Sequence, residues 1–231
     1  VDDAILSPNL NSAENFQDRI TFQGNGFRTT ENDSDTDASG HKFMYIAIRK
    51  IDGVVGKLPS AGTEVFSMDT GSGSSTIPNY DSTHVVDFAF ARKPGSSSDW
   101  WASARGYHGK EMKMNGGSSA GNYNKVVFDS MLGWQNESQQ DSSYQSWMFR
   151  QYQGLDISFY RGTGGGGDKH HNLGRVPEMI WCKCLDSAGD WTVYHKDLNG
   201  GTNPHDYRVL INSTAGESAS DDWGGPGKTA L

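Results

Sequence analysis

Apolar and polar residues alternate over short segments along most of the chain. The clearest of these segments are 19–23, 41–49, 85–92, 125–128, 144–150, 156–160, 178–183, 191–195 and 207–211. Successive side chains of a strand point to opposite faces, so this two-residue period predicts strands with one apolar face. No window of a dozen residues has a helical stripe, and clusters of Gly, Ser, Asn and Asp separate the segments. The pattern predicts an all-β fold of antiparallel sheets, sandwich-like or jelly-roll-like.

Several of these segments recur in the same order later in the chain. Residues 87–92 and the pair Asp99-Trp100 are followed 91 positions later by residues 178–183 and the pair Asp190-Trp191. Other matching blocks are 43–49 with 144–150, 64–67 with 156–159, and 112–115 with 209–212. Single short matches arise by chance, but an ordered series of five predicts an internal duplication.

The duplication divides the chain into three predicted parts. We expect N-terminal strands over 1–50 that end a preceding repeat, a diverged first repeat over 51–140 and a second repeat over 141–231. Each repeat supplies strands with one apolar face, which can be buried against the other copy or within a small sandwich of its own. The sequence is therefore expected to be a segment of a repetitive polypeptide.

Composition excludes several classes of function. The chain of 231 residues has a formal net charge of −8, so binding to nucleic acid through counterion release is not expected. The longest compact apolar run, 44–48, is far shorter than the ~20 residues that cross a bilayer, and membrane insertion is not expected. Cys182 and Cys184 lie on one face of a predicted strand, where we expect two buried thiols rather than a disulfide.

A longer motif carries a resemblance to a known family. Residues 171–183 read His-Asn-Leu-Gly-Arg-Val-Pro-Glu-Met-Ile-Trp-Cys-Lys, and residues 191–195 follow with Trp-Thr-Val-Tyr-His. With 210–215 and 223–226, this pattern resembles a repeated domain of unknown function in structural proteins of tailed bacteriophages, especially those that infect marine cyanobacteria. The close match covers 141–226. Residues 37–134 match as a diverged copy, in which Val86 stands where Pro177 stands in the second copy.

The resemblance implies a virion protein without catalytic activity. It implies a tail fibre or tail-associated component that acts in host attachment and is located in the virion. The implied partners are other copies of the chain, in a homo-oligomer such as a trimer, and other virion proteins. A carbohydrate-binding module is the alternative from another class, with a host surface glycan as the partner. A polysaccharide hydrolase or lyase is the third hypothesis.

Two groups of residues are candidate metal ligands. Asp33, Asp35 and Asp37 place carboxylates at alternate positions of one loop, as in Ca²⁺ loops, although the Gly and Glu of the helix-flanked version are missing. Ca²⁺ is therefore the one candidate cofactor, and a solvated acidic turn is the alternative. The histidines at 170, 171, 195 and 205 could in principle join the two cysteines around a metal, but turn hydrogen bonds explain them more simply.

The candidate ligand-binding residues are aromatic. Trp101 follows Trp100, and adjacent side chains cannot both enter one face of a strand, so one indole is expected to meet solvent, another chain or a glycan. Tyr107 and Tyr123 lie in Gly- and Asn-rich surroundings typical of glycan-binding loops. Packing between subunits is the alternative. Asp87 and Glu178 could suggest the paired carboxylates of a glycosidase, but they begin equivalent strands of the two repeats, and we predict no catalytic residue.

Overall fold

The computed structural model describes residues 59–223 apart from 75–76, 108, 123–125, 140 and 165–167, and the backbone of four short strands before residue 30. The strands are β1 (Asp3–Ile5), β2 (Asn15–Gln17), β3 (Ile20–Gln23), β4 (Gly26–Thr29), β5 (Phe66–Thr70), β6 (Tyr80–Asp81), β7 (Phe88–Arg92), β8 (Trp101–Ala104), β9 (Lys110–Lys113), β10 (Gly121–Asn122), β11 (Val126–Val127), β12 (Gly133–Asn136), β13 (Gln145–Phe149), β14 (Met179–Lys183), β15 (Trp191–His195), β16 (Tyr207–Leu210) and β17 (Ser218–Ala219). The 3-10 turns are η1 (Gly62–Glu64), η2 (Arg105–Tyr107), η3 (Glu137–Gln139), η4 (Leu198–Gly201) and η5 (Pro204–Asp206).

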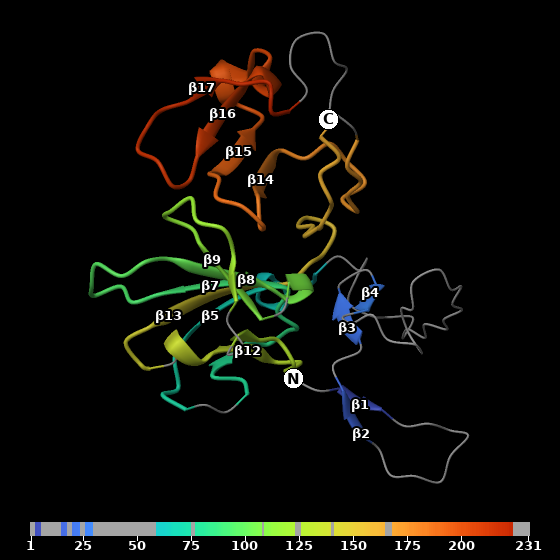
Figure 1. Ribbon diagram of the computed structural model, residues 1–231, viewed down its shortest axis with the longest axis vertical. Coiled ribbons are helices and arrows are strands. Elements are labelled where there is room, and N and C mark those ends of the chain that lie inside the picture. The colour runs from blue at the N-terminus through green and yellow to red at the C-terminus, as the bar shows by residue number, and fades with distance from the viewer. Residues whose placement is uncertain are drawn as a thin grey trace.

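The fold is all-β, as the alternation of apolar residues predicts. Every strand pair is antiparallel, and the described residues contain no α-helix and no helix suited to spanning a membrane. The largest sheet has the order β10-β9-β8-β7-β13-β5, a second has the order β14-β15-β16-β17, and a third has the order β11-β12-β6. Figure 1 shows β14–β17 at one end of the long axis, beyond the six-stranded sheet. Two hairpins, β1-β2 and β3-β4, complete the described strands.

One face of the six-stranded sheet packs against the three-stranded sheet. Ala89 and Ala91 of β7 and Met148 of β13 point into this core, where small side chains leave room for large rings. The large rings are those of Tyr80, Trp134 and Phe128. The ring centroid of Trp134 lies 5.6 Å from that of Tyr80 and 5.5 Å from that of Phe128. The indole N–H of fully buried Trp134 donates to Ser146 Oγ at 2.9 Å, so its one polar group stays paired.

The opposite face of the same sheet is aromatic. Phe88 and Phe90 of β7 lie beside Phe149 and Trp147 of β13, with ring centroids 6.2 and 5.3 Å apart. Trp100 packs over this row, 5.1 Å from Trp147. These side chains are half-buried, and Phe88, Phe90 and Trp100 also pack against a cluster that includes Trp191 of β15.

Two groups of four strands have the same order and the same register. We call β7-β8-β9-β10 the first meander and β14-β15-β16-β17 the second meander. Shifting the first two strands by 91 residues turns the pair Phe88↔Ala104 into Met179↔His195. Shifting β9 and β10 by 97 residues turns Trp101↔Lys113 into Thr192↔Leu210 and Gly121↔Glu111 into Ser218↔Arg208. A one-residue slip in any ladder would break this correspondence, because it would move every side chain to the other face.

Strand β13 fills the outer edge of the first meander. It lies between β5 and β7, although sequence analysis places its residues in the range of the second predicted repeat. The six-stranded sheet thus takes strands from both predicted ranges. Residues 156–160, which alternate in sequence and are predicted as a strand, form none in the structure. Alternation alone does not make a strand, because a ladder also needs a neighbouring strand.

Candidate functional site

The two Asp-Trp pairs stand at equivalent corners of the two meanders. In the first, the Trp100 N–H donates to Asn115 Oδ1 at 3.0 Å, and Asn115 Nδ2 donates to Asp99 Oδ1 at 3.0 Å. The Met114 N–H closes the corner on the Trp100 carbonyl at 2.9 Å. The Asn side chain therefore bridges the start of β8 to the end of β9 and orients the carboxylate beside it.

The second corner repeats each of these bonds. The Trp191 N–H donates to Asn212 Oδ1 at 2.9 Å, and Asn212 Nδ2 donates to Asp190 Oδ1 at 2.7 Å. The Ile211 N–H donates to the Trp191 carbonyl at 3.1 Å. The two pairs therefore share their backbone and Asn contacts, whereas their indoles differ, since Trp100 is half-buried beside Trp147 and Trp191 is 4% exposed.

The second corner also joins the two meanders. Trp191 is 4% exposed and packs with Ala102, Met112 and Met114 of the first meander. Its indole N–H donates to the Lys113 carbonyl at 2.8 Å. A large apolar ring whose one polar group is hydrogen-bonded can hold two sheets together. The contact of Trp191 therefore stabilises the packing of one meander on the other.

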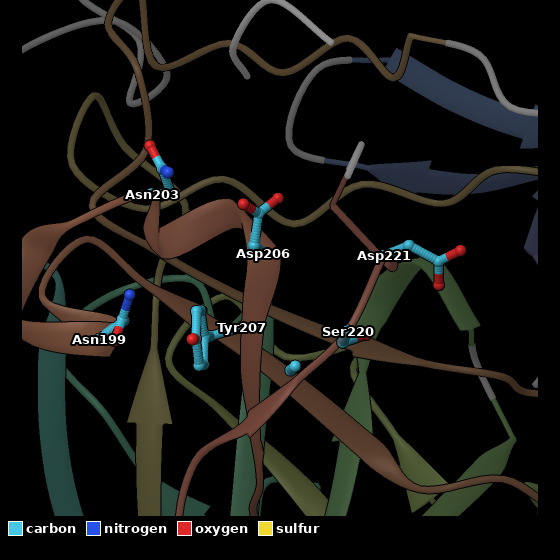
Figure 2. Close-up of a pocket in the computed structure, with 7 residues that line it drawn as sticks. Asn199, Asn203, Asp206, Tyr207, Ser220 and Asp221 are labelled. Carbon is cyan, nitrogen blue, oxygen red and sulfur yellow. The ribbon is translucent and has the colours of Figure 1, made fainter. Parts of the chain in front are cut away.

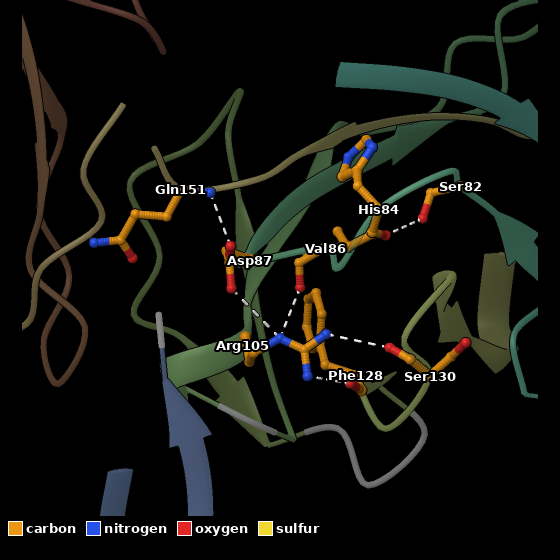
Figure 3. Close-up of polar contacts among 8 residues, drawn as sticks. All are labelled: Ser82, His84, Val86, Asp87, Arg105, Phe128, Ser130 and Gln151. Atoms are coloured by element: carbon orange, nitrogen blue, oxygen red, sulfur yellow. Dashed lines mark hydrogen bonds and ion pairs between the residues drawn. The ribbon is translucent and has the colours of Figure 1, made fainter. Parts of the chain in front are cut away.

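A buried ion pair lies at the start of β7 (Figure 3). Arg105 Nε is 3.5 Å from Asp87 Oδ1, and the two side chains are only 13% and 8% exposed. The Arg105 guanidinium also donates to the carbonyls of Val86, Phe128 and Ser130, and Asp87 Oδ2 accepts the Gln151 N–H at 2.8 Å. Burial raises the pKa of Asp87 and lowers the pKa of Arg105, so desolvation outweighs their mutual attraction, and the backbone bonds hold the pair in place.

The equivalent pair in the second meander is exposed. Glu178 Oε2 and Lys196 Nζ are 3.1 Å apart, with side chains 73% and 49% exposed. The Lys196 N–H donates to the Glu178 carbonyl as the Arg105 N–H donates to the Asp87 carbonyl. Each carboxylate considered for glycoside hydrolysis therefore has its own cation and begins its own strand, which supports a structural role for both.

A pocket of about 430 Å³ opens beside β16 (Figure 2). It is lined by Asn199, Asn203, Asp206, Tyr207, Ala219, Ser220 and Asp221. The turns η4 and η5 shape it, and Asn199 and Asn203 have φ of 51° and 46°, a left-handed conformation that Asn tolerates better than most residues. The Ser220 N–H donates to the Asp206 carbonyl at 2.8 Å and ties the segment after β17 to η5.

The chemistry of this pocket suits a neutral polyhydroxyl ligand. Its walls carry two amides, two carboxylates, a hydroxyl and one tyrosine ring, which match the hydroxyls and the apolar ring face of a sugar. The described residues contain no group of three His, Cys, Asp or Glu side chains that could hold a metal ion. The pocket is thus lined mainly by polar side chains that can form hydrogen bonds.

The predicted glycan-binding residues lie elsewhere. Trp101 is half-buried in β8, opposite Ala91 and Lys113. Tyr107 donates to Asp186 Oδ1 at 3.3 Å, and its ring stacks on Phe159 with centroids 6.1 Å apart. Tyr123 lies outside the described residues. Neither Trp101 nor Tyr107 lines the pocket, so the structure does not bring the predicted set together there.

The candidate metal ligands have two different outcomes. Asp33, Asp35 and Asp37 lie outside the described residues, and their Ca²⁺ site stays a prediction. The histidines and cysteines of the second group do not meet in a metal-binding cluster within the described part of the chain. Cys182 and Cys184 are free thiols, but the prediction that both are buried is wrong, since Cys182 is half-buried and Cys184 is exposed.

Sequence reasoning missed the pocket residues. The run of turn-forming residues from Asn199 to Pro204 predicts a loop, but it does not show that the segment around Ser220 returns to it. The sequence feature that could have indicated the pocket is the high number of Asn and Asp residues on both sides of the alternating strand 207–210. Such density is common in ordinary turns, so only the fold separates a pocket from a solvated loop.

Comparison with known proteins identifies the family. Neither the curated proteins nor the solved structures contain a match to the chain. One family model matches residues 108–229, which is slightly more than half of the chain and includes β9 to β17 together with the pocket and the second corner. The chain therefore belongs to the family described as a domain of unknown function (DUF7483).

Proposed function

We propose that this protein is a non-catalytic structural component of a bacteriophage virion, a tail fibre or tail-associated protein that acts in host attachment. The observation that carries the proposal is the pair of meanders with one order, one register and one Asp–Trp–Asn corner. Repeated β units joined through buried aromatic side chains are suited to extended, cohesive particles. The resemblance of residues 171–195 to phage structural proteins supports the proposed location in a virion.

The proposal includes the two repeats and the sandwich-like arrangement. Each repeat is one meander with its associated strands, and the three-stranded sheet on the first meander acts as the second layer of a sandwich. Copies of the chain assemble with one another, as a trimer or another symmetric homo-oligomer, and with other virion proteins. Exposed loop residues such as 161–164 and 168–169 are then available to face outward.

Purified particles provide the test of this proposal. Antibodies raised against the chain should label tails or fibres in electron micrographs, and its peptides should appear in the proteome of particles purified by density gradient. Labelling of the host cell alone, with no peptide in the particles, would refute the virion assignment. The oligomeric state of the isolated chain should exceed a monomer in sedimentation equilibrium.

The pocket beside β16 favours a second candidate, a carbohydrate-binding module for a host surface glycan. Its polar walls and its single aromatic ring support this function. On a glycan array, Tyr207→Ala should abolish binding to any glycan that the chain recognises, and Trp101→Ala should leave it intact. The reverse result would assign recognition to the aromatic residues predicted from sequence. Absence of any saturable glycan binding would leave the structural role alone.

A further inference from the structure

The outer edge of β14 is where the two meanders differ in their strand neighbours. In the first meander, β7 pairs with β8 on one side and with β13 on the other. In the second, β14 pairs with β15, and no strand among the described residues pairs with its other side. Figure 1 shows β14 at this edge of its sheet. An unpaired edge presents a row of N–H and C=O groups that another strand can bind.

The hydrogen bonds identify the groups that face outward. The Lys196 N–H donates to the Glu178 carbonyl, so this carbonyl and the backbone groups of Ile180 and Cys182 are directed toward β15. Met179, Trp181 and Lys183 then direct theirs to the open side. Their counterparts under the 91-residue shift are Phe88, Phe90 and Arg92, which pair with Phe149, Trp147 and Gln145 of β13.

The side chains of β14 lack the cover that their counterparts have. Phe88 and Phe90 are half-buried against the rings of β13, whereas Met179 is 51% and Trp181 44% exposed. The Trp181 indole N–H donates to the sulfur of Met179, two residues earlier in the same strand, at 3.0 Å. Large apolar side chains on an open strand edge mark a binding surface rather than a solvated one.

The acidic residue at the start of β14 also indicates that a strand like β13 can bind at this edge. Asp87 accepts the Gln151 N–H, and Gln151 follows Arg150 directly after β13. Glu178 occupies the equivalent position and is 73% exposed, with Lys196 on one side. The residue that follows an incoming strand can therefore donate its N–H to Glu178, as Gln151 does to Asp87.

From these observations we infer that the β14 edge binds an antiparallel strand of the β13 type. This occupant is a strand of a different polypeptide with the β13 pattern, with large apolar residues at alternate positions opposite Met179 and Trp181 and a basic residue at its end. The main-chain ladder supplies affinity, and the alternate apolar pockets supply specificity. The inference rests on the proposed equivalence of the two meanders and extends it to a specific interaction between units.

A peptide that copies residues 144–151 is the probe. Added to the full chain, the fluorescein-labelled peptide should bind saturably in fluorescence anisotropy. A peptide of the same composition with Trp147 and Phe149 moved to adjacent positions should not bind, because its apolar residues no longer share one face. Trp181→Ala in the chain should weaken binding about tenfold, as expected for loss of one aromatic anchor, and Val176→Ser should leave it unchanged.

Amide hydrogen exchange gives a second test that needs no variant. In the free chain, the amides of Ile180 and Cys182 should be protected and those of Met179, Trp181 and Lys183 should exchange fast. The peptide should protect the second set and leave the first set unchanged. Absence of saturable binding, or binding that leaves the second set unprotected, would overturn the inference. So would self-association of the chain through Trp181 without peptide binding, because the occupant would then be a second copy. None of these results would affect the labelling of virions, which tests the proposed function separately.

Discussion

Removal of the Arg105 guanidinium should be among the most destabilising single changes in the chain. Arg105→Met keeps the bulk of the side chain but leaves Asp87 as a buried, unpaired carboxylate and three carbonyls without their donor. Breaking a buried pair by removing one partner costs about 3–5 kcal/mol, because the remaining charge cannot return to water. We therefore expect the free energy of unfolding to fall by about 4 kcal/mol.

Lys196→Met is the matched control. Lys196 is the counterpart of Arg105 under the 91-residue shift, but its pair with Glu178 is exposed. Solvent already screens that pair, so the free energy of unfolding should not change measurably. Urea unfolding followed by tryptophan fluorescence and by far-ultraviolet circular dichroism measures both variants, and amide exchange shows whether the loss is confined to the first meander.

The double variant Asp87→Asn/Arg105→Met separates charge from hydrogen bonding. It removes the unpaired carboxylate but still leaves the carbonyls of Val86, Phe128 and Ser130 without the guanidinium. We expect it to be more stable than Arg105→Met alone and less stable than the unchanged chain. Equal costs for Arg105→Met and Lys196→Met would refute the reasoning, since burial would then not control the energy of the pair.

Three further predictions follow from single contacts. Asn115→Ala and Asn212→Ala should each cost about 1–2 kcal/mol in urea unfolding, because each removes two bonds at equivalent corners; a cost at one corner only would contradict their equivalence. Burial raises the pKa of Glu111, so the folded state holds this proton more tightly and stability should fall as pH rises from the ordinary glutamate pKa to the raised one; Glu111→Gln should remove this component of a stability–pH profile, and an unchanged profile would count against it. Ser187 lowers the pKa of the exposed Cys184 thiol, so mass spectrometry should find alkylation by iodoacetamide first at Cys184, and earlier labelling of Cys182 would contradict this.

Predictions from local pattern agree with the structure for most alternating segments that it describes, but not for 156–160, which forms no strand. The alternation in 88–92 and 179–183 makes strands of both segments, because side-chain period and backbone pleat are local properties. The recurrence of Asp-Trp indicates equivalent turns, because a turn is formed by neighbouring residues. The glycan and Ca²⁺ predictions at Trp101, Tyr107 and Asp33 are untested, since composition alone does not reveal which loops meet.

The sequence by itself determined that the fold is all-β and that the alternating segments 88–92 and 179–183 form strands, since side-chain alternation is a local property. Only the tertiary structure decided which of two similar strands is covered. Phe90 and Trp181 have the same place in their meanders, yet one packs on Trp147 and the other is 44% exposed. The physical reason is that β13 comes from far along the chain, and burial, unlike alternation, depends on which distant segments arrive.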